Sequence, residues 1–296
     1  MNMRPPRSTR GGPAAASDVY KRQSPLGANV GQNMGYPFTQ AMQDQYDLTS
    51  QGLSAERIAD KWGITRGEAD EFAVESQMKA ARAQKEGRFK GEMVPVPGKK
   101  KNKNADGTEE LVDAVIDFDE GIRPNTTLEV LTALKPSFRE NGVHHAGNSS
   151  QITDGSSAVL LTHLDKAKEM GWKPRARIVS QAVVGSDPAL MLTGPITATP
   201  LALQRAGLTM RDIDLVEINE AFASVVLSWK REMNADMSKV NVNGGAIALG
   251  HPTGCTGARL FGTIINELER TGGRYGAVSY THLTMPTHHA VYISLG

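Results

Sequence analysis

Apolar residues recur at helical spacing in the first half of the chain, and residues 53–63 and 65–87 are predicted to form two helices. Thr65 and Glu68 have the spacing of a capping box, in which each side chain accepts a hydrogen bond from a free amide of the first turn. One face of the second helix carries Ala69, Phe72, Ala73, Ser76 and Ala80. Gly87 suits the position after its last turn, where the backbone becomes left-handed. The pattern therefore predicts an amphipathic helix pair.

Short apolar runs alternate with helical patterns in the second half of the chain. The predicted strands are residues 158–162, 177–184 and 215–218. The predicted helices are residues 165–170, 200–206, 221–233 and 254–270, the last with Leu260, Ile264, Ile265 and Leu268 on one face. Alternation of this kind indicates a layered α/β fold with a mixed or parallel sheet. The charged stretch at 98–110 is predicted to be a solvated loop.

Composition narrows the class of protein. The chain has 296 residues, with 33 Lys and Arg against 32 Asp and Glu, and this balance gives no reason to expect a nucleic acid or an anionic membrane as partner. A single cysteine excludes an internal disulfide framework and suits a reducing compartment. The sequence contains no apolar run long enough to span a bilayer, and its first residues do not form a secretory signal. We therefore expect a cytoplasmic protein.

A glycine-rich run at 241–259 contains five glycines together with His251 and the only cysteine, Cys255. Such a density of glycine implies a shaped turn that can approach a ligand closely. His251 comes just before the last predicted helix, whose positive end disfavours an imidazolium, so the ring is expected to be neutral near pH 7 and able to accept a proton. Free amides of that helix could stabilise an oxyanion. The alternative is that His251 is only a turn residue or a helix cap, with no part in chemistry.

Cys255 also lies at the expected helix start, where a thiolate is stabilised. One hypothesis is therefore a Cys–His pair for nucleophilic catalysis. The other is a small buried side chain, which is the more common role of a lone cysteine.

Two further polar segments flank apolar strands. Asn219 closes the strand at 215–218, where ligands gather in α/β sheets, and could hold a water or an oxyanion. Its alternative role is that of a helix N-cap. Ser150, in the turn-forming run at 147–156, could bind a ligand amide or could only shape the turn.

Three blocks together resemble the thiolase family: Gly-Asn-Ser-Ser-Gln-Ile-Thr-Asp-Gly at 147–155, Asn-Glu-Ala-Phe at 219–222 and Gly-Gly-Ala-Ile-Ala-Leu-Gly-His-Pro at 244–252. The similarity extends from about 24 to 277. It implies the thiolase fold, a layered α-β-α-β-α arrangement of two βαβαβαββ halves with an inserted cap domain, here incomplete.

The resemblance also implies a division of the chain. Residues 24–152 correspond to the cap domain, 153–182 to the last part of the N-terminal half and 183–277 to most of the C-terminal half. Residues 1–23 are expected to be a non-homologous, disordered leader and 278–296 a non-homologous tail. Both ends resemble translated adapter sequence.

The reaction implied by the resemblance is cleavage of a 3-ketoacyl-CoA by coenzyme A, or the reverse Claisen condensation, with CoA as a substrate and no further cofactor. His251 matches the histidine that activates a thiol and helps to stabilise the oxyanion, and Asn219 matches the asparagine that fixes a water there. Ser150 matches a serine that contacts the pantetheine arm, with Phe222 as the aromatic residue beside it. Arg123 matches a cap-domain arginine near the nucleotide end of CoA, although it could be a plain surface arginine.

In the family the position of Cys255 is alanine or cysteine and is not the nucleophile. The family's nucleophilic cysteine lies upstream of the cap domain, and a second cysteine follows the stretch that matches 272–277. Neither has a counterpart in this sequence, so the chain itself is expected to be an inactive piece that binds CoA weakly. The resemblance further implies a homodimer or a homotetramer.

Two other hypotheses have different consequences. A non-catalytic lipid-carrier relative of the thiolases would keep the fold without turnover. Residues 53–73 also scan as a helix-turn-helix DNA-binding element. That segment carries five acidic and three basic side chains, and this is the wrong sign for neutralising phosphates.

Overall fold

The computed structural model describes residues 39–104, 107–282 and 287–294. Its main sheet has four strands in the order β3-β6-β5-β4. The strands are β3 (Arg177–Val184), β4 (Leu215–Ile218), β5 (Tyr275–His282) and β6 (Thr287–Ser294). β4 and β5 are parallel, whereas β6 is antiparallel to both β3 and β5. The predicted strands at 177–184 and 215–218 are confirmed with the bounds expected.

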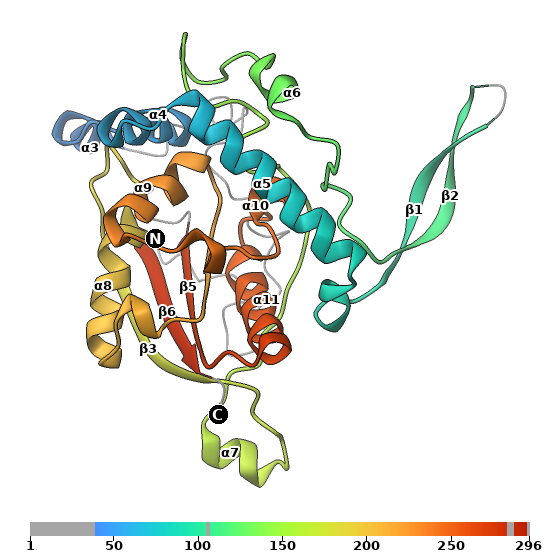
Figure 1. Cartoon of the computed structure of the whole chain (residues 1–296), viewed down its shortest axis with the longest axis vertical. Coiled ribbons are helices and arrows are strands. Elements are labelled where there is room, and N and C mark those ends of the chain that lie inside the picture. Colours follow the sequence, from blue (N-terminus) through green and yellow to red (C-terminus); the bar gives the residue numbers. More distant parts are fainter. Residues whose placement is uncertain (1–38, 105–106, 283–286, 295–296) are drawn as a thin grey trace.

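Helices cover both faces of this sheet (Figure 1). They are α8 (Gly194–Ala206) and α9 (Ala223–Met233) on one side and α11 (Thr256–Thr271) on the other. Because successive residues of a strand point to opposite faces, Val216 and Ile218 pack in the cluster with α8 and α9, while Leu215 packs against Leu260 and Ile264 of α11. Every residue of β4 is therefore buried. The layered α/β arrangement expected from the sequence is confirmed.

Residues 39–91 are mainly helical. Their elements are α3 (Gln40–Gln45), α4 (Gln51–Trp62), α5 (Arg66–Lys85) and the short 3-10 helix η2 (Arg88–Gly91). The predicted capping box opens α5: Thr65 Oγ1 accepts from the Glu68 amide at 3.2 Å, and Glu68 Oε2 accepts from the Thr65 amide at 2.8 Å. The apolar face predicted for this helix is buried, and Gly87 is left-handed as expected.

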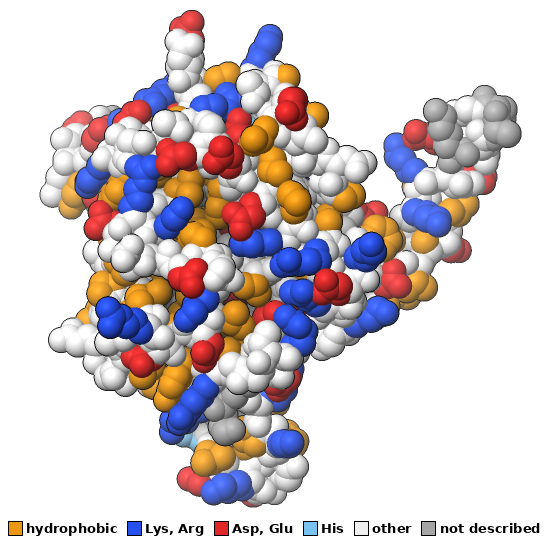
Figure 2. All heavy atoms as spheres, viewed as in Figure 1, with side chains coloured by type: hydrophobic (Ala, Val, Ile, Leu, Met, Phe, Trp, Pro, Cys, Tyr) orange, Lys and Arg blue, Asp and Glu red, His pale blue; other side chains and the backbone are white. Residues whose placement is uncertain are grey.

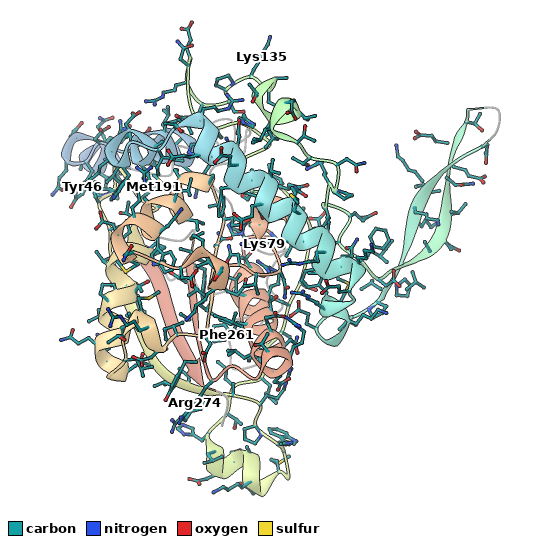
Figure 3. All side chains as sticks on the ribbon, viewed as in Figure 1. Tyr46, Lys79, Lys135, Met191, Phe261 and Arg274 are labelled. Carbon is teal, nitrogen blue, oxygen red and sulfur yellow. The ribbon has the colours of Figure 1, made fainter. Side chains whose placement is uncertain are left out.

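Basic side chains join α5 to the glycine-rich run. Lys79, labelled in Figure 3, donates from Nζ to the Val240 carbonyl at 3.2 Å, and Arg88 donates to Asn243 Oδ1 at 2.8 Å. Figure 2 shows Lys and Arg side chains gathered over α5 and α11 on this face. Lys79 of α5 thus binds the residue just before the glycine-rich run, and Arg88 of η2 binds a residue within it.

Arg66 has a similar structural role at the start of α5. It pairs with Asp70 at 3.0 Å and donates to the carbonyls of Leu131, at 2.9 Å, and Leu134, at 2.8 Å. These contacts fix the short helix α6 (Leu128–Thr132) to α5. The helix-turn-helix hypothesis would need Arg66 to contact DNA phosphate. In the structure its guanidinium binds other parts of the fold instead.

The solvated loop predicted at 98–110 is wrong. A hairpin of β1 (Val96–Lys103) and β2 (Glu109–Ile116) occupies this stretch and projects from the body of the protein (Figure 1). The alternation of charge places Lys99 opposite Asp113, and Lys101 binds Glu109 at 2.8 Å. Attraction between opposite charges on β1 and β2 therefore favours their pairing. Each segment is polar, so on its own it resembles a loop.

The strand predicted at 158–162 is also wrong, because the structure assigns no helix or strand to residues 151–163. The segment is apolar and extended in pattern, but it pairs with no neighbouring strand in the part of the chain that the structure describes. Apolar character alone does not make a strand, since a strand needs a partner for its backbone hydrogen bonds. The exposed fractions of Leu160 and Leu161, 66% and 67%, agree with this unpaired state.

Helix ends differ from the predictions by a few residues. The helix predicted at 200–206 begins six positions earlier, at Gly194, and contains Pro200. The remaining predicted helices are found with ends shifted by one to two residues, as α7 (Leu164–Glu169), α9 and α11. The short elements η3 (Met210–Asp212), η4 (Met237–Lys239) and α10 (Ala246–Leu249) were not predicted. The leader predicted at 1–23 lies outside the described residues.

None of the helices among the described residues has both the length and the apolar character that crossing a membrane requires. The same residues hold no group of three or more His, Cys, Asp and Glu side chains placed to bind a metal ion.

Candidate functional site

His251 lies in the tight turn between α10 and α11. Gly250 ends α10 with a φ of 86°, and a Cβ at this position would lie 2.4 Å from the side chain of Thr153, so only glycine fits. The His251 amide donates to the Gln151 carbonyl at 3.0 Å. The glycine-rich run and the segment at 147–155, both singled out in the sequence, are therefore joined at the histidine.

Hydrogen bonds define the tautomer of the His251 ring. Thr256 Oγ1 donates its one proton to the Pro252 carbonyl at 3.1 Å and accepts the hydrogen of His251 Nδ1, 2.6 Å away; these roles fit Asn219 Nδ2, which can only donate, beside Nε2. The other ring nitrogen, Nε2, is then unprotonated. It accepts from Nδ2 of Asn219 at 3.3 Å. The network leaves the lone pair of Nε2 directed towards the end of β4.

The ring is neutral at pH 7, as predicted. Burial, and to a smaller extent the positive charge of Arg259, lower the pKa of His251 to about 4. The helix start was expected to be the cause, but α11 begins only at Thr256, five residues after the histidine. Desolvation of the imidazolium is therefore the main reason for the low pKa.

Asn219 occupies the position directly after β4. Its amide donates to the Ser279 carbonyl of β5 at 3.0 Å, and its side chain is almost completely buried. Phe222, and not Asn219, is the N-cap of α9, so the capping alternative is wrong. Within the described part of the chain, Asn219 Oδ1 has no hydrogen-bond partner. The carboxamide thus presents one donor to His251 and retains one acceptor.

Ser150 and Phe222 belong to neighbouring segments beside this pair. The Ser150 amide donates to the Ala221 carbonyl at 3.0 Å, and Ser149 forms an isolated bridge with Phe222. The Phe222 ring packs edge-on against His144, with ring centroids 5.4 Å apart. The structure therefore brings four of the five predicted site residues into one region.

Comparison with known proteins identifies the family. The model described as "Thiolase, N-terminal domain" matches residues 15–165, and the model described as "Thiolase, C-terminal domain" matches residues 172–290. This chain belongs to the thiolase family. The domain boundaries expected inside it, at 152 and 182, stay predictions.

Curated thiolases resemble the chain over most of its length. The peroxisomal 3-ketoacyl-CoA thiolase A of Mus musculus is 48% identical over 233 residues, which are 78% of this chain and 54% of that protein. The 3-ketoacyl-CoA thiolase of Bacillus subtilis is 46% identical over 230 residues, 78% of this chain and 59% of that protein. The chain thus spans about half the length of the curated relatives it matches.

Solved thiolase structures share the fold. Human mitochondrial 3-ketoacyl-CoA thiolase superimposes with a TM-score of 0.77 at 40% identity, covering 84% of this chain and 62% of that one. The same human enzyme in complex with CoA gives a TM-score of 0.76 at 40% identity, with 84% and 61% covered. The thiolase fold expected from the sequence motifs is confirmed.

Arg123, the fifth predicted residue of the thiolase site, lies apart from the His251–Asn219 pair. It is exposed on the loop between β2 and α6, and its amide donates to Gln77 Oε1 at 2.7 Å. No contact joins its guanidinium to the other four predicted residues among those described. Its loop is nevertheless connected to the site, because Gln151 Nε2 donates to the Gly121 carbonyl at 2.8 Å.

Cys255 does not pair with His251 in the described structure. Thr256 and Asn219 engage the two nitrogens of His251, while the Cys255 side chain is buried at the N-cap of α11. Burial raises the pKa of its thiol, and this effect exceeds the lowering by the Ser157 hydrogen bond and by the charge of Arg259. The structure favours the hypothesis of a small buried side chain.

Three residues of the site were not found from the sequence. Thr256 sets the tautomer of His251. In the sequence, only the presence of a hydroxyl side chain directly after Cys255 could have indicated this role. Gln151 joins three backbone segments, since its Nε2 also donates to the carbonyls of Ile247, at 2.9 Å, and Ala248, at 3.0 Å. Glu217, two positions before Asn219 in β4, is fully buried, and burial raises its pKa to about 8. Glu217 could have been recognised from the sequence, because it is a charged residue inside an otherwise apolar strand.

Proposed function

We propose that the protein to which these residues belong exchanges acyl groups with coenzyme A, cleaving a 3-ketoacyl-CoA or condensing acyl-CoAs in the reverse direction. One observation carries this proposal: His251 offers an unprotonated Nε2 to a site that it shares with the Asn219 carboxamide. The names of the curated relatives, 3-ketoacyl-CoA thiolase and acetyl-CoA acetyltransferase, support the choice of substrate class.

In the proposed mechanism His251 acts first as a base. Its Nε2 takes the proton of a thiol, and the resulting thiolate attacks the 3-keto carbonyl of the substrate. Collapse of this adduct breaks the C2–C3 bond: C2 takes up the proton that the thiol gave to His251 and leaves as an acyl-CoA, while the acyl group stays on the sulfur until the thiol of CoA accepts it. Before the collapse the carbonyl oxygen is negative. The Nε2–H of His251 and the Nδ2–H of Asn219 converge from two different segments and can donate to this oxygen. Because a ring with a pKa of about 4 holds its proton weakly, it is a strong donor to the oxyanion and returns the proton readily.

The remaining predicted residues would bind the substrate. We assign Ser150 to the amides of the pantetheine arm and Phe222 to its apolar side, and their position on adjacent segments beside Asn219 supports this. Arg123 would bind phosphate at the nucleotide end, where its exposed cation suits a charged hydrogen bond. CoA is a substrate in this scheme, and no other cofactor is required.

The chain as printed is proposed to have no turnover by itself and to bind CoA weakly. Covalent thioester chemistry needs an accessible thiolate, and the single cysteine of the sequence, Cys255, has a buried side chain with a raised pKa. A cooperative site that lacks one member loses most of its rate.

The assay compares the protein translated from the full reading frame with the chain of 296 residues. Each is incubated with CoA and 3-ketoacyl-CoA substrates of several chain lengths, and the acyl-CoA products are measured. Thiolysis by the full protein and none by the chain is the expected result. A folded full protein that cleaves no 3-ketoacyl-CoA, yet binds acyl chains, would replace this proposal with the lipid-carrier hypothesis.

We further propose that the full protein is a homodimer or homotetramer located in the cytoplasm. The near-neutral charge and the single cysteine support the location, although the curated relatives named above include peroxisomal proteins. Light scattering after gel filtration measures the assembly, and a monomer at micromolar concentration would contradict it.

A further inference from the structure

The side chain of Gln151 connects α10 to the loop at 119–123. Its Nε2 donates to the Gly121 carbonyl of this loop at 2.8 Å. The same nitrogen donates to the carbonyls of Ile247, at 2.9 Å, and Ala248, at 3.0 Å. Because an amide NH2 group has only two hydrogens, the three carbonyl oxygens share them and are held close together.

A second glutamine makes a similar connection from α5, which lies beside α10 (Figure 1). Gln77 Nε2 donates to the Ile247 carbonyl at 3.2 Å, and Gln77 Oε1 accepts from the Arg123 amide at 2.7 Å. Between these attachments the Ile122 side chain packs against the hydrophobic cluster that contains Ala248. Three consecutive residues of the loop are therefore attached to α10, either directly or through a glutamine.

The loop also lies in direct backbone contact with α10. A Cβ at Gly121 would lie 2.9 Å from the Ala248 carbonyl oxygen and 3.2 Å from Nε2 of Gln151. The first of these distances is shorter than a methyl group tolerates, so glycine is needed for this close approach. The separation between the loop and α10 is thus fixed on both sides of the Gln151 amide.

The main chain of Gln151 holds the turn that carries His251. Its carbonyl accepts from the His251 amide at 3.0 Å, and its own amide donates to the Ala246 carbonyl of α10 at 3.4 Å. The turn begins where α10 ends, at Gly250. One residue therefore contacts the loop at 119–123, the short helix α10 and the histidine that the proposed mechanism uses as its base.

We propose that Gln151 is a positioning residue, through which the nucleotide end of CoA, bound at Arg123, holds the His251 turn in place. This inference rests on the function proposed above. Arg123 is exposed, but its amide is tied to Gln77, so an anion bound by its guanidinium is held relative to α10. Binding energy gained far from the reacting atoms then orients the base, and it raises kcat rather than only lowering KM.

The test compares a substrate that has the nucleotide with one that lacks it. The full protein is assayed with a 3-ketoacyl-CoA and CoA, and with the matching 3-ketoacyl-pantetheine and pantetheine, and kcat and KM are measured separately. Gln151→Met removes the amide and keeps the length of the side chain. Gln84→Met is the matched control, because Gln84 Oε1 accepts from the Asp119 amide of the same loop at 3.2 Å, while no described hydrogen bond joins Gln84 to α10.

The ratio of kcat with CoA to kcat with pantetheine is expected to be about 10 or more in wild type and in Gln84→Met. In Gln151→Met it should fall to within about 3-fold of one. A wild-type ratio near one, an unchanged ratio in Gln151→Met or an equal fall in Gln84→Met would overturn the proposal. If Gln151→Met does not fold, the same criterion applies to Gly121→Ala, whose added methyl group separates the loop from α10.

Amide hydrogen exchange of the same proteins distinguishes failure of this inference from failure of the proposed function, because it needs no turnover. In wild type CoA should slow exchange at 244–252 more than pantetheine does. Gln151→Met should abolish this difference and keep the slowing at 119–123 by CoA. Equal slowing of 244–252 by both ligands in wild type would contradict the inference even if thiolysis is observed. If the full protein shows no thiolysis, this measurement alone decides.

Discussion

Nδ2 of Asn219 lies 3.3 Å from Nε2 of His251, although the two residues are 32 positions apart in the chain. Asn219 directly follows the buried strand β4, and His251 lies in the turn before α11. α11 covers the face of β4 that carries Leu215. The strand and the helix run in opposite directions, so the end of one meets the beginning of the other. The site is thus a consequence of how β4 and α11 pack.

Thr256 is expected to control the histidine tautomer. Thr256→Val removes the acceptor of the Nδ1 hydrogen, so a fraction of the rings should carry the proton on Nε2 and be unable to act as a base. We predict a fall in kcat of about 10-fold or more in the full protein, with KM little changed. Thr256→Ser keeps the hydroxyl and should restore most of the rate. Equal kcat values for Thr256→Val and wild type would show that Thr256 does not set the tautomer.

Cys255 is expected to be dispensable for turnover. Its side chain is buried and both nitrogens of His251 have other partners, so Cys255→Ser should change kcat of the full protein by less than about 3-fold. Cys255→Ala serves as the control for the polarity of the new hydroxyl. Loss of activity in both folded variants would restore the Cys–His pair as the catalytic unit.

Glu217 should make the stability of the chain depend on pH. Burial raises its pKa from 4.5 to about 8, so the folded state keeps a proton that the unfolded state releases above pH 4.5. The stability from this group is fully present below pH 4.5 and is lost as the pH rises through about 8.

Glu217→Gln removes the ionisation and keeps the shape of the side chain. The free energy of unfolding of this variant, relative to wild type, should therefore rise by roughly 1 to 3 kcal/mol between pH 5 and pH 8. Urea unfolding at several pH values measures it, with Glu110→Gln on the exposed hairpin as the matched control. A difference between variant and wild type that does not change with pH would show that Glu217 ionises freely in the fold.

Local patterns were sufficient to predict much of this fold. The capping box of Thr65 and Glu68 and the apolar face of α5 depend on residues within a few turns of one another, and both are confirmed. β4 was recognisable because all of its residues except Glu217 are apolar. The hairpin at 96–116 was missed because its two strands form through pairing with each other along their whole length, and no window on one strand contains that pairing.

The candidate site was predicted only in part, because only some of its features depend on residues that are close in sequence. His251 and Asn219 stand out locally, one among glycines and the other at a strand end. The His251 ring donates its Nδ1 hydrogen to Thr256, and the charge of Arg259 acts on the same ring. Both effects depend on how α11 packs against the sheet. The neutral ring was predicted correctly but for the wrong main cause, since burial cannot be read from the residues next to a histidine.

The most direct measurement of the proposed role of His251 is the rate of 3-ketoacyl-CoA thiolysis by the full protein carrying His251→Ala, Asn219→Ala or both. Because the two side chains are proposed to act on one oxyanion, each single change should lower kcat by roughly 10²- to 10⁴-fold, and the double change should cost much less than the product of the two. Circular dichroism and thermal unfolding confirm that each variant is folded. Near-normal turnover by folded His251→Ala would contradict the proposed site.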